Sequence, residues 1–306
     1  MSKDYNSISS DWVDAHHHLW DLDNIHYPWL AARGERRFFG QPDAIRHNYL
    51  VNDFVADHQG LVQKSVHIQV GAARAEQLKE TQFVEQMSQV TLAKLNNRYP
   101  SAAVVAVDMW ADNIEASINA HLQHNIVRGV RDIIGKSPEE NSSLPTFNSA
   151  KLLNNWKFLA ENQLSFDLQL TSEQYAEVLA TLEKVPELNV AICHLASPWD
   201  QTETGFNNWQ QWMQKFAQLP NCYIKLSGFA MFRQQFIAAD FRKYAHSAIN
   251  IFGPDRCMFG SNFPVDKLYV SYSDLFAQWQ EVVTCYNLEE SMQLSAGTAT
   301  HFYRLS

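Results

Sequence analysis

The sequence alternates eight short apolar runs with stretches of helical periodicity, and this alternation is the feature that most constrains the fold. The strand-like runs are residues 13–18, 62–70, 102–110, 127–134, 164–170, 188–196, 222–229 and 257–263. Helical spacing of apolar residues follows at 75–98, 113–124, a stretch ending at 162, 172–184, 209–218, 236–252, 272–286 and 288–302. Strands that alternate with helices indicate a parallel sheet with crossover helices.

Eight such units in 306 residues fit a (β/α)8 TIM barrel, regular or distorted, formed by a single domain over residues 1–306. The competing arrangement is an open, doubly wound sheet. No glycine-rich phosphate loop follows the first run, which disfavours a dinucleotide-binding sheet. Residues 19–60 form one long connection after the first run, and a connection of this length predicts a binding loop or lid.

Composition excludes several kinds of partner. The net charge of -9 argues against a basic face for nucleic acid. No apolar run is long enough to cross a bilayer, and the first residues have no apolar core of a secretory signal. The four cysteines form no CxxC pair. We therefore expect a cytoplasmic protein that acts on a small molecule and binds neither nucleic acid nor membrane, with a monomer and a homodimer both open.

In a barrel of this kind the active site lies at the carboxyl ends of the strands. The first run ends with His16 and His18, whose side chains share one face because strand side chains alternate. Two imidazoles so placed can converge on one cation or on one anionic substrate. The polar residues that end the other runs are His67, Gln69, Asp108, Arg128, Arg131, Asp167, Gln169, His194, Lys225, Ser227 and Asn262. For Gln69, Asp108 and Asp167, a supporting hydrogen bond or a solvated strand end is an alternative explanation.

Positive charge near the strand ends predicts an anionic substrate. Arg131, Lys225 and Arg233 stand out in an acidic chain, and arginine binds carboxylates through two parallel hydrogen bonds. The alternative is that each of them pairs with a local aspartate or glutamate. The predicted substrate contacts are completed by Trp20, Gln69 and Gln169.

An ordered set of motifs, one at nearly every strand end, carries a resemblance to a known family. The motifs are DAHHHLWD at 14–21, YPWL at 27–30, RGVRDI at 128–133, CHLASP at 193–198, YIKLSG at 223–228 and RCMFGSNFPV at 256–265. With them the chain resembles the amidohydrolase superfamily, in the branch of 2-pyrone-4,6-dicarboxylate lactonase and the sugar-acid lactonases. The resemblance implies a TIM-barrel hydrolase, metal-dependent or metal-independent, and favours a lactonase for a small anionic lactone or ester.

The departures from the family pattern concern its metal ligands. Two-metal members carry a bridging lysine or glutamate on strand four and a histidine on strand five, where this chain has Arg131 and Gln169. The resemblance therefore implies either no metal or one divalent ion, preferably Zn²⁺. Such an ion would be held by His16, His18 and His194.

A further departure concerns the general base. Asn262 stands where the family has an aspartate, and a carboxamide cannot accept a proton near neutral pH. His194 and Asp266 are the candidates to replace that base. Together with His16, His18 and Asn262 they make the predicted catalytic set.

Two other functions stay open from the sequence. Loss of the aspartate at position 262 is also expected of a pseudoenzyme that binds a small acid without turnover. Relatives in the same branch include metal-dependent decarboxylases, so release of carbon dioxide from an aromatic acid is the other alternative.

Overall fold

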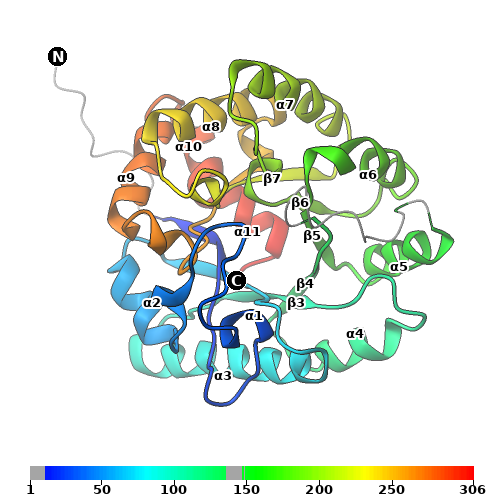
Figure 1. Ribbon diagram of the computed structural model, residues 1–306, viewed down its shortest axis with the longest axis vertical. Coiled ribbons are helices and arrows are strands. Elements are labelled where there is room, and N and C mark those ends of the chain that lie inside the picture. The colour runs from blue at the N-terminus through cyan, green and yellow to red at the C-terminus, as the bar shows by residue number, and fades with distance from the viewer. Residues whose placement is uncertain (1–10, 136–146, 148) are drawn as a thin grey trace.

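The computed structural model describes residues 11–135, 147 and 149–306, and its eight strands form one sheet in the order β1 to β8. Every pair of neighbours in this order is parallel, and the sheet curls into a barrel surrounded by helices (Figure 1). The strands are β1 (Val13–His17), β2 (Lys64–Ile68), β3 (Ala102–Ala106), β4 (Val127–Ile133), β5 (Ser165–Gln169), β6 (Val190–Ile192), β7 (Cys222–Leu226) and β8 (Cys257–Phe259). The predicted (β/α)8 barrel is confirmed.

Backbone hydrogen bonds at the carboxyl end join β1 to the segment that follows β8. The N–H of His18 donates to the carbonyl of Phe263 at 2.7 Å, and the N–H of Asn262 donates to the carbonyl of His16 at 2.7 Å. These two bonds bring the first and the last strand ends together. They also place Asn262 beside both histidines of the first strand.

The α-helices pack on the outside of the barrel or close its end. They are α1 (Pro28–Ala31), α2 (Val51–His58), α3 (Gln77–Leu95), α4 (Glu115–His121), α5 (Ala150–Glu161), α6 (Tyr175–Leu182), α7 (Glu203–Phe216), α8 (Ala238–Phe252), α9 (Tyr272–Val283), α10 (Leu288–Met292) and α11 (Thr298–Tyr303). Short 3₁₀ turns cover Asp43–Ile45, Arg74–Glu76, Ser172–Gln174, His194–Ala196, Phe229–Phe232, Pro254–Arg256 and Asp266–Leu268. In the described ranges, no helix is both long and apolar enough to cross a membrane.

Two predicted elements differ from the structure. The long connection 19–60 contains α2, which supplies the helix expected after β1. The single helix predicted at 288–302 is instead α10 and α11, joined by a π-helical turn at Gln293–Gly297. The residues that join the three segments all have right-handed helical backbone, so the π turn inserts an extra residue into one helical stretch.

The inside of the barrel is filled from below by the last helix. Phe302 and Tyr303 of α11 pack against strand residues such as Val13, Val66 and Ala102, all of them buried. Figure 1 shows α11 in the middle of the ring of strands. This apolar filling leaves the opposite, carboxyl end of the barrel for the polar side chains.

The first strand changes register between Asp14 and His17. Both of these side chains contact outer helices: Asp14 accepts a hydrogen bond from Tyr272 of α9, and His17 stacks on Phe54 of α2. His16 packs instead against His194, with its ring centroid 4.4 Å away. The irregularity therefore lets the first strand send aromatic and acidic groups outward and still present imidazoles at the barrel mouth.

Candidate active site

A cavity of about 450 Å³ opens at the carboxyl ends of the strands. Its polar lining from the strand ends consists of His18, Arg131, Gln169, His194 and Asn262. Its apolar wall consists of Pro28, Trp29, Ala32, Phe38, Phe39, Val70, Ile133, Met231 and Val265. The structure thus brings five of the predicted site residues together around one cavity that has room for a small organic molecule.

His16 lies just beneath this lining, buried between the other two imidazoles. Its ring centroid is 4.4 Å from that of His194 and 5.1 Å from that of His18. Burial lowers the pKa of His16 well below its ordinary range, and the nearby charge of Lys225 lowers it further. All three imidazoles have a lowered pKa because they are buried, so each is neutral near pH 7.

Arg131 brings a positive charge into the cavity wall. It is buried, and its guanidinium donates to the carbonyl of Gln69 and, at 3.5 Å, to the side-chain oxygen of Gln169. Within the described residues its Nε has no partner, and no carboxylate lies within the 4.0 Å of an ion pair. Burial lowers the pKa of Arg131, but a guanidinium in a protein keeps its proton. Arg131 is therefore a buried cation with no carboxylate counter-ion among the described residues.

Asn262 bridges a cavity histidine to a buried acid. The Nδ1 of His18 is 2.7 Å from the carbonyl of Ile68, so Nδ1 carries the proton. The other ring nitrogen of His18 is 3.2 Å from the side-chain oxygen of Asn262, whose Nδ2 donates to Asp266 at 2.8 Å. In a neutral His18 this second nitrogen is an acceptor, and it faces another acceptor.

Turning the Asn262 amide over resolves this conflict. Its Nδ2 then donates to the neutral His18, and its oxygen accepts from Asp266 in the protonated state. Burial raises the pKa of Asp266 to about 7, and burial lowers the pKa of His18 to about 3. Below about pH 7, neutral His18 and protonated Asp266 therefore favour the turned amide.

Below the imidazoles lies a buried ion pair that the sequence does not reveal. The Nζ of Lys225 donates to Asp167 at 2.5 Å, to the carbonyl of Ala15 at 2.9 Å and to the Nδ1 of His16 at 3.4 Å. The hydroxyl of Tyr303, from α11, donates to Asp167 at 2.9 Å. Lys225 and Asp167 are therefore structural partners at the barrel centre and do not line the cavity.

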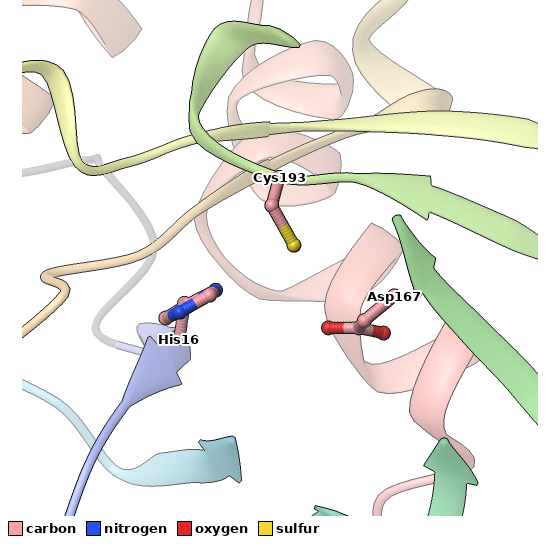
Figure 2. Close-up of side chains that lie close together, drawn as sticks. All are labelled: His16, Asp167 and Cys193. Carbon is pink, nitrogen blue, oxygen red and sulfur yellow. The ribbon is translucent and has the colours of Figure 1, made fainter. Parts of the chain in front are cut away.

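The set of three histidines predicted as zinc ligands is not among the donor groups that the described residues bring within 4.8 Å of one another. In the described part of the chain, the group whose donor atoms all lie within 4.8 Å of one another is His16, Asp167 and Cys193 (Figure 2). Burial raises the pKa of Cys193 to about 12, so it is a thiol, and Asp167 is bound to Lys225 and Tyr303. Because an ammonium already lies among these donors, the residues present do not fit a tightly held divalent ion.

His194 is positioned by an unusual backbone turn after β6. Four consecutive residues, His194 to Ser197, have φ between 52° and 58°, in the left-handed region. The hydroxyl of Ser227 lies 3.0 Å from the Nδ1 of His194. Gly228 permits this approach, since a Cβ there would lie 2.3 Å from the same nitrogen. The turn contains no glycine, so the sequence carries no signal for it.

Besides Lys225, three predicted substrate contacts lie outside the cavity lining. Gln69 turns its side chain to the N–H of Gly71 and offers only its carbonyl to Arg131. Trp20 is fully buried and donates to the carbonyl of His47. Arg233 pairs with Asp240 at 3.0 Å, which is the local pairing left open above. The individual residues of the apolar cavity wall were not predicted from the sequence, although the connection at 19–60 that supplies several of them was predicted to be a binding loop or lid.

An eight-stranded parallel barrel with imidazole, guanidinium and amide groups at its carboxyl ends defines an enzyme of the TIM-barrel class. The model of the amidohydrolase family matches residues 13–305, and the chain belongs to this family. The predicted superfamily is thus confirmed.

Related proteins cover nearly the whole chain. It is 31% identical over 299 residues to protein y4mH of Sinorhizobium fredii, covering 96% of this chain and 98% of the relative. It is 25% identical over 311 residues to an L-fucono-1,5-lactonase of Burkholderia multivorans, covering 96% of both. A solved amidohydrolase of Burkholderia multivorans with bound zinc shares the fold, with a TM-score of 0.79 and 22% identity over 97% of this chain and 100% of the other.

Proposed function

We propose that the protein is a lactonase that hydrolyses the ester bond of a small anionic lactone or a similar ester. The observation that carries this proposal is Arg131, a buried cation in the cavity wall with no carboxylate partner in the described part of the chain. A guanidinium in that state is matched by a carboxylate of the substrate. The lactonase among the relatives supports the same reaction class.

Each side chain of the site has a separate role in the proposed hydrolysis. Arg131 binds the substrate carboxylate, and the apolar wall around Trp29 and Phe38 excludes water from the ring. His194 lines the cavity, and we assign it the proton of the attacking water because the Asn262 amide cannot accept one. Water adds to the carbonyl carbon, the ring C–O bond breaks, and the proton returns to the leaving oxygen to give a hydroxy acid. Asp266 lies behind Asn262 and sets the orientation of that amide.

We propose that this hydrolysis needs no tightly bound metal, because Arg131 places a buried cation in the cavity wall and the Lys225 ammonium already binds two of the clustered metal donors, His16 and Asp167. The other alternative is one weakly held zinc ion on His16, His18 and His194. Hydrolysis rates of the chelator-treated protein with and without added Zn²⁺ separate the two, because a weakly held ion that takes part in the reaction is removed by the chelator and restores activity when it is returned. Two ions about 3.5–4 Å apart would contradict both.

The anion-binding role of Arg131 is tested by replacing it with methionine. Losing a desolvated charge partner costs about 2–5 kcal/mol, which corresponds to a rise in KM for an anionic lactone of about 30-fold or more. The matched control is Arg128→Met on the same strand, because Arg128 donates to the carbonyls of Asn125 and Val127 and does not line the cavity. Initial rates on a panel of lactones with and without a carboxylate provide the measurement.

An unchanged KM in Arg131→Met, with neutral lactones hydrolysed equally well, would exclude an anionic substrate. The same panel includes aromatic acids, whose loss of carbon dioxide would instead favour a decarboxylase. Binding of acids without turnover of any compound would favour the pseudoenzyme.

A further inference from the structure

We propose that the ammonium group of Lys225 is a built-in cation that occupies the position where metal donors converge, and that it fixes His16 as the tautomer with hydrogen on Nε2. The inference concerns the floor of the site and not the substrate. Only the identity of the oxygen that His16 would contact rests on the proposed function.

The first step concerns what surrounds the ammonium. Its three N–H groups are taken by Asp167 at 2.5 Å, the carbonyl of Ala15 at 2.9 Å and the Nδ1 of His16 at 3.4 Å. Two of these partners, His16 and Asp167, belong to the buried three-donor cluster of His16, Asp167 and Cys193 shown in Figure 2. The charge of the Lys225 ammonium is therefore already neutralised by Asp167, and its remaining hydrogen bonds go to Ala15 and His16.

The second step concerns the proton on His16. An ammonium group has donors and no acceptor, so Nδ1 of His16 accepts and carries no hydrogen. A neutral imidazole with a bare Nδ1 has its hydrogen on Nε2. That Nε2 is buried and has no hydrogen-bond partner among the described residues. His16 therefore presents an N–H for which a water or a substrate oxygen is the missing acceptor.

The third step concerns what holds the ammonium in place. Lys225 and Asp167 are both fully buried, and the Tyr303 hydroxyl lies 2.9 and 3.0 Å from the two carboxylate oxygens of Asp167. The Lys225 ammonium also lies 5.1 Å from the centre of the Tyr303 ring. The last helix therefore supports the ion pair from below, and the ion pair supports His16 from below.

The tautomer is tested in the unmodified protein by ¹⁵N NMR of histidine side chains, with His16→Gln to assign the His16 signals. We expect His16 to show an unprotonated Nδ1 and a protonated Nε2. A protonated Nδ1 would overturn the proposal, because Lys225 cannot donate to a nitrogen that carries hydrogen. This measurement does not depend on any variant of Lys225 being folded.

The cation position is tested by adding Co²⁺ to Lys225→Ala. Without the ammonium, we expect His16, Asp167 and Cys193 to bind one cobalt ion per chain, with the absorption of a cobalt–thiolate bond, at a concentration where the wild type binds none. The double variant Lys225→Ala/Cys193→Ser should lose this absorption. Lys215→Ala, which removes an exposed lysine, should behave as the wild type.

Two results would overturn this part of the proposal. One is a folded Lys225→Ala that takes up no cobalt, and the other is a wild type that binds cobalt through His16 as tightly as the variant does. Neither readout uses turnover, so a failed lactonase assay leaves the tautomer and the cation position to be judged independently.

Discussion

Asn262 stands at the end of the last strand, where the resemblance to the family predicts an aspartate. It has φ 57° and connects His18 to Asp266 through its amide. An amide bridge orients its neighbours but removes no proton, which is why we assign proton transfer to His194. Proton transfer and orientation are thus assigned to different residues: His194 transfers the proton, and Asn262 with Asp266 orients the neighbouring groups.

Asn262→Asp tests whether the base has been relocated. The new carboxylate would lie about as close to Asp266 as the present amide, and two adjacent carboxyls share one proton. With His194 as the base we expect a modest change in the hydrolysis rate and a shifted pH profile. A general base supplies a factor of about 10²–10⁴ in rate. If the wild type is inactive and the hydrolysis rate of Asn262→Asp rises by such a factor, the wild type only binds its ligand. His194→Ala, measured on the same lactones, should lose most of the activity.

Asp266 predicts how the stability of the fold depends on pH. Burial raises its pKa from 3.8 to about 7, so the folded state binds the proton more tightly than the unfolded state. This contribution is present below the unfolded pKa and is lost as pH rises to about 7, and it amounts to at most about 4 kcal/mol.

Asp266→Asn stays uncharged and should therefore gain stability relative to the wild type between about pH 4 and pH 7, with no further change above that range. Denaturant unfolding of both proteins at several pH values measures the difference. A constant gap between the two curves would mean that Asp266 is ionised throughout.

Among the secondary-structure elements, the turn after β6 has an unfavourable left-handed backbone conformation, and hydrogen bonds from two helices hold it in place. The carbonyls of Leu195 and Ala196 accept hydrogen bonds from Trp209 and Tyr175, which lie on two neighbouring helices. A left-handed conformation costs an ordinary residue roughly 1–2 kcal/mol. The two helices therefore impose the turn that aims His194 at the cavity.

Ala196→Gly measures the local cost of this turn against Ala248→Gly in α8. Both alanines are fully buried, but only Ala196 has a positive φ, 58°. Glycine relieves the strain at position 196, which offsets the lost methyl group and the added freedom of the unfolded chain. We expect the free energy of unfolding to change little in Ala196→Gly and to fall by about 1–2 kcal/mol in Ala248→Gly. Equal losses in the two variants would show that the turn is unstrained.

At the scale of the whole molecule, the barrel is built around a polar centre closed by its own last helix. The Tyr303 hydroxyl is part of that centre, whereas the equally buried hydroxyl of Tyr244 has no partner within the described residues. Tyr303→Phe should therefore lower the free energy of unfolding by about 1–3 kcal/mol, and Tyr244→Phe should leave it unchanged or raise it. Similar values for both would place the stabilising effect of Tyr303 in its ring alone.

The fold was predictable because the strand–helix alternation is a local property of the chain. Strand lengths were overestimated at β6 and β8, where apolar residues continue into loops that carry His194 and Asn262. Alternation shows which residues share a face but not which way that face points. His67 and Gln69 do share a face, and that face looks outward, with His67 lying 3.9 Å from Glu80 of α3.

The polar contacts of the site were less predictable than its members. Lys225 and Asp167 are 58 residues apart, and only the closed barrel brings them together. Arg233 and Asp240 are seven residues apart, and this short separation allows a surface pair that takes Arg233 away from the cavity. Of the three predicted charges, only Arg131 lines the cavity, whereas Lys225 and Arg233 each pair with an aspartate.

The segment between β1 and α2 has a consequence for how substrate preference can change. Pro28, Trp29, Phe38 and Phe39 all come from this excursion, whereas the reactive groups come from the strand ends. The two ends of the excursion are fastened to each other by paired backbone hydrogen bonds between Trp20 and Tyr49, at 2.9 and 3.0 Å. The entropic cost of closing a loop rises only slowly with the length of the loop. A segment of another length or composition can therefore be closed by the same backbone hydrogen bonds between Trp20 and Tyr49. We therefore expect that grafting this segment between relatives would change the preference for the apolar part of the substrate, whereas Arg131 and the other strand-end groups would stay unchanged.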